Sequence, residues 1–185
     1  MNKASVQTAQ TQSEKTKTII LAALMAALTC VGTMIIRIPT PTMGYIHPGD
    51  GFVLLSGLLL GPVWGSLAAG IGSALTDLIG GYFIYVPATL IIKALTALTC
   101  FALFTAIKKI LGENKIVPAL IISGIVGELV MVAGYFIYEI FLLADGSLAA
   151  GVIASAAGIP ANLIQGVFGV IISTVLYPLL CKLAK

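Results

Sequence analysis

The chain has 185 residues, of which 59% are hydrophobic and only 9% are charged, and its mean hydropathy is +1.10. A soluble domain carries about 25% charged residues, so this composition excludes a water-covered globular surface and predicts an all-α integral membrane protein. The formal net charge of +3 is small. Because basic residues do not cluster with aromatic residues, we expect no nucleic-acid partner.

The N-terminal segment, residues 1–16, is polar and lacks an apolar core. It therefore does not resemble a secretory signal, and we expect a flexible cytoplasmic tail. The rest of the chain, residues 17–185, is predicted to be a single transmembrane domain.

Apolar segments follow the tail in chain order, and each is a candidate for spanning the membrane. They are Lys17–Ile36, Gly51–Gly80, Val86–Ile107, Ile116–Leu143 and Ile159–Leu183. A span needs about 20 residues, so the second segment is too long for one helix. It contains Gly61 and Pro62, and we divide it there into helices near Pro48–Leu60 and Val63–Gly80. The prediction is six transmembrane helices.

Lysine placement supports this count. Lysines flank the start of the first helix, the turn "KKILGENK" and the end of the last helix. Six helices put all of them on one side, with only Arg37 near the other, whereas five helices would scatter them across both faces. We therefore expect both termini to be cytoplasmic.

The outer loops are then "RIPTPTMGYIHPG", "GGYFIYVP" and "LADGSLAAGVIASAAGIP", the last long enough to act as a lid. The only histidine, His47, precedes a predicted helix start at Pro48, and Asp50 follows near that N-terminus. Asp50 is explained equally well as a helix-start residue that favours the N-terminal dipole or as part of a site. His47 is the better candidate for contacting a ligand.

Several polar residues fall inside the predicted spans, where an ionisable side chain costs at least ~2.5 kcal/mol and is normally paired or functional. They are Asp77, Lys93, Glu128, Glu139, Asn162 and Gln165. Most of them lie near the outer ends of their helices, below tyrosine-rich loops. Lys93 has an alternative role, pairing with Asp77 or Glu139 only to hold helices together. Glu128 is deeper, and we leave its role open.

These residues predict a compact pocket for a polar aromatic ring compound, because tyrosine and histidine stack on rings while amides and charges read donors and acceptors. The tyrosines could also form an interfacial belt. The candidate substrate-binding residues are Tyr45, His47, Tyr82, Tyr85, Lys93, Tyr135, Glu139, Asn162 and Gln165.

The first helix carries two pairs of small residues at a spacing of four, formed by Ala22, Ala23, Ala26 and Ala27. Such faces allow helices to approach closely. We weigh internal packing equally against a docking surface for another membrane protein.

Motifs for energy coupling and catalysis are absent from the sequence. It contains no GxxxxGK[ST] phosphate loop, no HExxH and no cluster of metal ligands, and its three cysteines are far apart. We therefore expect neither an enzyme nor a resident cofactor or metal, but a binding protein that takes its energy from elsewhere.

Three stretches together resemble the S components of energy-coupling factor (ECF) vitamin transporters. They are "AALMAAL", "GYIHPGDGFVLLSGLLLGPVWGSLAAGIGSALTDLIGGYFIYVPATLIIKAL" and "GIPANLIQGVFG". Within that family, "IHPGD" and "PANLIQ" are most similar to members assigned to hydroxymethylpyrimidine, a thiamine precursor, or to pyridoxine. The resemblance covers nearly the whole chain after residue 17.

The resemblance implies a multi-pass protein of a prokaryotic plasma membrane that captures a vitamin from outside with high affinity. It also implies a transmembrane coupling subunit (T component), on which the alanine face of the first helix docks, and two cytoplasmic ATPases that use ATP. Two alternatives remain open: a small ion-coupled carrier without ATPases, and a membrane-embedded enzyme using Asp77, Glu128 and Glu139 as acid–base groups.

Overall fold

The computed structural model describes residues 3–112, 114–144 and 146–182, and these form an almost entirely helical protein. The elements in chain order are α1 (Lys3–Ile35), β1 (Ile38–Pro39), β2 (Tyr45–Ile46), α2 (Asp50–Gly80), α3 (Val86–Leu111), α4 (Ile116–Leu142), α5 (Leu148–Ala156) and α6 (Ile159–Leu180). Within these ranges, α1, α2, α3, α4 and α6 are long and apolar enough to cross a membrane. The all-α membrane class is confirmed; the count of six spans and the side of the termini stay predictions.

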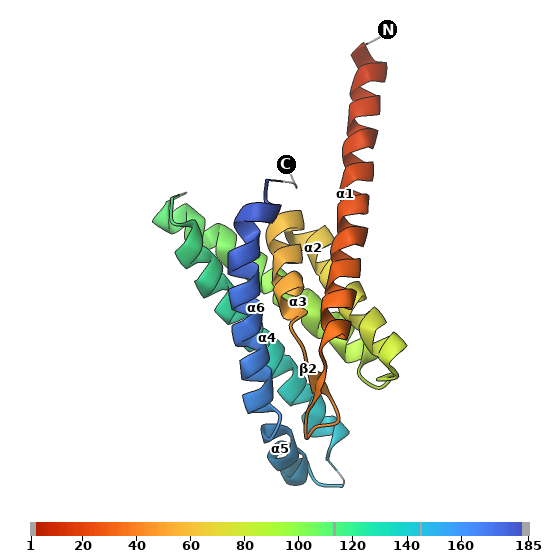
Figure 1. The fold of residues 1–185 in the computed structure, drawn as a ribbon, viewed down its shortest axis with the longest axis vertical. Coiled ribbons are helices and arrows are strands. Elements are labelled where there is room, and N and C mark those ends of the chain that lie inside the picture. The colour runs from red at the N-terminus through yellow and green to blue at the C-terminus, as the bar shows by residue number, and fades with distance from the viewer. Residues whose placement is uncertain (1–2, 113, 145, 183–185) are drawn as a thin grey trace.

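The long helix α2 bends at Gly61, where the sequence predicts a break. Gly61 has φ 80° and ψ −170°, a left-handed conformation that glycine adopts without strain, and Pro62 follows it. The 31 residues of α2 would measure about 46 Å as one straight helix. Instead the chain turns back at the bend, so that both ends of α2 lie farther from the C-terminal end of the chain than the bend does (Figure 1).

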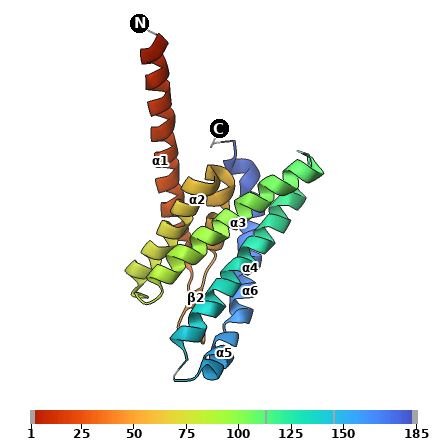
Figure 2. The same ribbon diagram turned by 180° about the vertical axis from the view of Figure 1, so that it is seen from behind.

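Helix α2 is the centre of the bundle. It contacts α1, α3 and α6, while α4 contacts α3, α5 and α6 (Figure 2). Because lipid supplies no hydrophobic drive between helices, close approach of backbones matters most. Gly57 of α2 lies against the backbone of Ala97 in α3, and Gly72 lies against the backbone of Ala26 in α1. A side chain at either glycine would push the helices apart.

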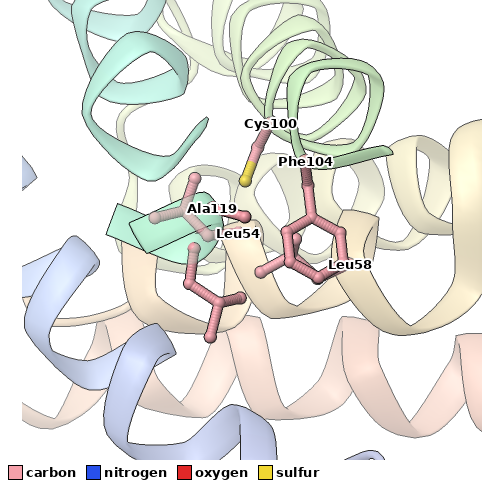
Figure 3. Packing of buried hydrophobic residues seen from close by; sticks show 6 residues of the cluster. Leu54, Leu58, Cys100, Phe104 and Ala119 are labelled. Carbon is pink, nitrogen blue, oxygen red and sulfur yellow. The ribbon is translucent and has the colours of Figure 1, made fainter. Parts of the chain in front are cut away.

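The apolar core between α2, α3 and α4 is small and closely packed. Leu54 and Leu58 of α2 meet Cys100 and Phe104 of α3 and Ala119 of α4, and all five side chains are buried (Figure 3). The cluster occupies the part of the bundle nearer the termini. It leaves the opposite end for polar residues.

The first helix is longer than predicted. Residues 3–16, which we expect to form a flexible tail, continue α1 in the structure. The physical reason is that the segment from Lys3 to Val31 has neither glycine nor proline and is rich in alanine, glutamine and lysine, which favour helix. Residues 1 and 2 lie outside the described part.

The segments that connect the helices away from the termini carry some structure of their own. In the first, β1 and β2 form a short antiparallel hairpin that pairs Ile38 with Ile46 and Pro39 with Tyr45. The last, predicted as a lid-length loop, contains α5, which packs against α4. The hairpin and α5 lie at the same end of the molecule (Figure 1). This end holds the polar residues described next.

Candidate functional site

A cavity opens among the β1–β2 hairpin, the α2–α3 turn and the adjacent parts of α3, α4 and α6. The space among its lining atoms, counted together with the open solvent at its mouth, is about 460 Å³. All of the predicted substrate-binding residues except Lys93 line it: Tyr45, His47, Tyr82, Tyr85, Tyr135, Glu139, Asn162 and Gln165. Their contact with a substrate stays a prediction.

Lys93 does not line the cavity, because it is held behind it by Asp50. Its Nζ lies 2.5 Å from Asp50 Oδ1, and both side chains are fully buried. The sequence suggested Asp77 or Glu139 as its partner, so the identity of the counter-ion is corrected. The ammonium also lies 5.3 Å from the centre of the Tyr135 ring. Lys93 thus neutralises Asp50 and contacts the back of Tyr135, a residue of the cavity wall.

Asp50 joins three separate segments of the chain. It is the first residue of α2, where the positive end of the helix dipole favours a carboxylate. Its second oxygen, Oδ2, accepts a hydrogen bond of 2.6 Å from the Gln165 side chain on α6. The Gln165 carbonyl oxygen in turn accepts one of 2.9 Å from the backbone N–H of His47. Asp50 therefore begins the helix as expected and links the segments behind the cavity, which it does not line.

His47 is kept in one neutral form by its own loop. Its Nδ1 accepts a hydrogen bond of 3.1 Å from the backbone N–H of Gly49, so the ring proton resides on Nε2. Burial of the imidazole lowers its pKa from 6.5 to about 3. At neutral pH the ring is consequently an uncharged donor at the cavity surface.

Tyrosine rings form one wall of the cavity. The Tyr45 ring lies 4.6 Å from that of Tyr82 and 5.5 Å from His47, and its hydroxyl donates to Asp77 Oδ1 at 2.6 Å. On the other side, Tyr85 donates to the Thr42 carbonyl at 2.5 Å. Burial raises the pKa of both Tyr45 and Tyr85, so these hydroxyls remain protonated donors.

Glu139 has one oxygen that the described residues leave without a hydrogen bond. Oε1 lies 3.3 Å from the Tyr85 hydroxyl, which shares its single proton with the nearer Thr42 carbonyl, and Oε2 has no partner there, although the residue is only 3% exposed. An unsatisfied buried acceptor costs about 1–3 kcal/mol. A donor group on a bound molecule would satisfy it, which makes Oε2 the strongest single indication of a ligand.

Glu128, in contrast, lies apart from this cavity. Its side chain is buried against Gly166 and Gly169 of α6, and neither carboxylate oxygen has a hydrogen-bond partner among the described residues. It lines a separate apolar groove between α4 and α6. An acid–base set of Asp77, Glu128 and Glu139 in one cavity, the enzyme alternative, is therefore not assembled.

Sequence reasoning missed several lining residues, including Thr33, Thr40 and Ser73. Ser73 and Asp77 share a face of α2 with small residues, a pattern that indicates helix packing. Both are buried as packing predicts, but they also reach the cavity. The only sequence feature that could have indicated contact with the cavity, and not packing alone, is that both residues are polar and lie near the end of α2.

The four alanines of α1 divide into two faces. Ala22 is buried beside α2, and Ala26 lies against the backbone of Gly72, so both pack inside the protein. Ala23 and Ala27 are exposed on the outer face of α1. Docking of a partner stays a prediction, and this second pair is the one accessible for it.

Comparison with known proteins gives consistent matches. The family model described as "ECF-type riboflavin transporter, S component" matches residues 13–182. A protein of Pyrococcus woesei, described as "Uncharacterized protein in gap 3'region", is 35% identical over 143 residues, which cover 77% of this chain and 86% of that protein.

Two solved structures share the fold. The "S component of a bacterial ECF transporter" aligns with a TM-score of 0.66 and 24% identity, covering 92% of this chain and 99% of that one. The "S-component for biotin from an ECF-type ABC transporter" aligns with a TM-score of 0.61 and 23% identity, covering 90% and 93%.

Removing the ammonium of the buried ion pair is expected to destabilise the protein strongly. Lys93→Met leaves Asp50 as a buried, unpaired carboxylate and should cost about 3–5 kcal/mol of unfolding free energy. Thermal unfolding in detergent measures the effect, with Lys115→Met at an exposed position as the matched control. The double variant Asp50→Asn, Lys93→Met should recover part of the loss; a double variant less stable than Lys93→Met would contradict the pairing.

The depressed pKa of His47 predicts a pH dependence of stability. The unfolded chain protonates His47 below pH 6.5, but the folded protein does so only near pH 3. Stability is therefore full above pH 6.5 and declines as the pH falls toward 3. In His47→Asn, which keeps an acceptor for Gly49, the melting temperature should fall less between pH 7 and 4.5. Equal slopes for the two proteins would argue against a buried neutral imidazole.

Proposed function

Because this chain belongs to the ECF-type riboflavin transporter S-component family, we propose that it is the high-affinity capture subunit of an ATP-driven importer and binds a small heteroaromatic vitamin in the tyrosine-lined cavity. Proteins of this family are integral plasma-membrane proteins and substrate-binding subunits of transporters, not enzymes. They work together with a T component and ATPases.

The observation that carries the proposal is the cavity with the unpartnered Glu139 Oε2 in its wall. A heteroaromatic ring fits between tyrosine faces, which favour offset or edge contacts with other rings. Ring N–H, amino or hydroxyl groups can donate to Glu139, while the Asn162 amide and His47 Nε2–H match the remaining acceptors and donors of such a ring. A purely apolar ligand would leave these groups unsatisfied.

Three vitamins or precursors have this chemistry. Hydroxymethylpyrimidine and pyridoxine are the compounds that the sequence resemblance favours, and riboflavin is the compound for which the matching family is named. All three combine a planar ring containing nitrogen with hydroxyl groups. The compact pair remains our preferred substrate class, because each is a small ring that carries both a hydroxymethyl donor and a ring-nitrogen acceptor.

Energy must come from partner subunits in this proposal, because the sequence has no phosphate loop. The exposed small face of α1, formed by Ala23 and Ala27, suits close approach of a helix from the T component. The alternative, an ion-coupled carrier, would transport its substrate without any ATPase.

Ligand binding by the isolated chain tests the capture function. We expect the protein purified in detergent to bind one of the three compounds with a sub-micromolar Kd, measured by calorimetry, and to release it for mass spectrometry. Glu139→Gln should weaken binding about tenfold or more, since an amide is a poorer acceptor than a carboxylate. Glu14→Gln, the same change on the exposed part of α1, is the control. No binding of any of the three would refute the proposal, and uptake into liposomes without ATPases would favour the carrier.

Docking on the coupling subunit is tested on the exposed face of α1. Ala23→Leu with Ala27→Leu should abolish copurification with the T component, because bulky side chains prevent close helix approach, while ligand affinity is retained. Ala133→Leu, at an exposed position of α4, is the control. Retained copurification of the Ala23, Ala27 double variant would remove this face from the interface.

A further inference from the structure

Ser73 carries a buried hydroxyl that the protein itself leaves without a partner. The residue lies roughly two turns before the end of α2 at Gly80, and its side chain is only 2% exposed. Its Oγ has no hydrogen-bond partner among the described residues. Because bulk water does not reach the interior of a membrane-embedded bundle, the missing hydrogen bond is costly.

Other buried hydroxyls on the helices avoid this cost by a local hydrogen bond. Serine and threonine in a helix can donate to the carbonyl oxygen four residues earlier. On α2 itself, Thr76 donates to Gly72 at 3.0 Å and Ser56 donates to Phe52 at 2.7 Å. On other helices the same bond is formed by Thr29, Thr33, Thr96 and Ser155. Ser73 does not form it, so its hydroxyl remains available to another group.

The group that Ser73 can reach lies in the cavity, because Ser73 is one of the lining residues. Among the described residues, buried side-chain oxygens without a partner belong to Ser73, Glu128, Glu139 and Thr174. Of these, Ser73 and Glu139 line the cavity. The Ser73 hydroxyl would donate to Glu139 Oε2 if the two atoms were close enough, yet both lack a partner. A bound molecule therefore needs two separate polar groups to satisfy both.

The chemistry of a hydroxyl decides which group suits Ser73. It donates one hydrogen bond and accepts others at the same atom. A ring nitrogen would use only its donor, and an amino group only its acceptor. A second hydroxyl uses both, since it also donates and accepts at one atom.

We propose that Ser73 is a specificity-determining residue that binds a hydroxyl group of the ligand, at a position separate from the donor group that meets Glu139. This inference rests on the proposed function. It adds a contact from α2 to that function, and it requires two polar groups on the ligand, one of them a hydroxyl.

The experiment changes one hydroxyl on the protein and one on the ligand. The ligand pairs are pyridoxine with its single-deoxy analogues, hydroxymethylpyrimidine with the analogue in which a methyl group replaces the hydroxymethyl group, and riboflavin with lumiflavin. For the parent compound that binds, Ser73→Ala should weaken binding about five- to tenfold, measured by calorimetry on the full chain in detergent. For the analogue that lacks the contacted hydroxyl, the same variant should change the Kd less than about twofold.

The outcomes separate this inference from the proposed function. If a parent compound binds and Ser73→Ala leaves its Kd unchanged, the inference alone is overturned, and Ser73 then contacts only water. Equal losses for the parent and all of its analogues also overturn it, because the contact would not be to a hydroxyl. If no parent compound binds, the proposed function fails and the inference fails with it.

A structural role of Ser73 is tested by the stability of the ligand-free protein. Ser73→Ala removes an unsatisfied group, so the melting temperature should stay the same or rise by a few degrees. The matched control is Ser56→Ala, which removes a buried hydroxyl that is bonded to Phe52 and does not line the cavity. This control should leave the Kd unchanged and should not raise the melting temperature. A melting temperature of Ser73→Ala below that of Ser56→Ala would show a packing role and contradict the inference.

Discussion

The buried contact between Asp50 and Lys93 is the constraint on which the rest of this end of the protein depends. A carboxylate and an ammonium that are fully removed from water require each other, since either alone would cost several kcal/mol. Asp50 begins α2 and Lys93 lies two turns into α3, so the pair sets how deep these helices lie relative to one another. Gln165 adds α6 to the same contact through the second carboxylate oxygen.

The cavity follows from this arrangement. With the starts of α2, α3 and α6 held together, the β1–β2 hairpin lies over them and brings Tyr45 and His47 to the surface of the hollow. The aromatic rings contribute area and hydroxyl donors, and Glu139 contributes an acceptor without a protein partner among the described residues. The result is a cavity in whose wall Glu139 Oε2 is left as a buried acceptor that a donor group on a bound molecule would satisfy.

The two ends of the bundle are built on different physical principles. Toward the termini, close packing of Leu54, Phe104 and their neighbours, together with the glycine contacts of α2, holds the helices together. Toward the hairpin, buried polar side chains do so, and their pairing must be nearly complete in a low-dielectric environment. This division places the cavity at one end of the bundle, while Ala23 and Ala27 are exposed on the outer face of α1.

The sequence by itself determined the class of protein, the approximate positions of the long helices, the break at Gly61 and the tyrosine, histidine, glutamate and amide side chains that meet in the cavity. These follow from local properties, namely apolar length, helix-breaking residues and the cost of placing a polar group in lipid. The tertiary structure alone decided that Lys93 pairs with Asp50 and not with Asp77 or Glu139, and that Ala22 faces inward while Ala23 faces outward. Pairing and facing depend on the rotation and depth of each helix relative to its neighbours, and no single segment of the chain encodes these.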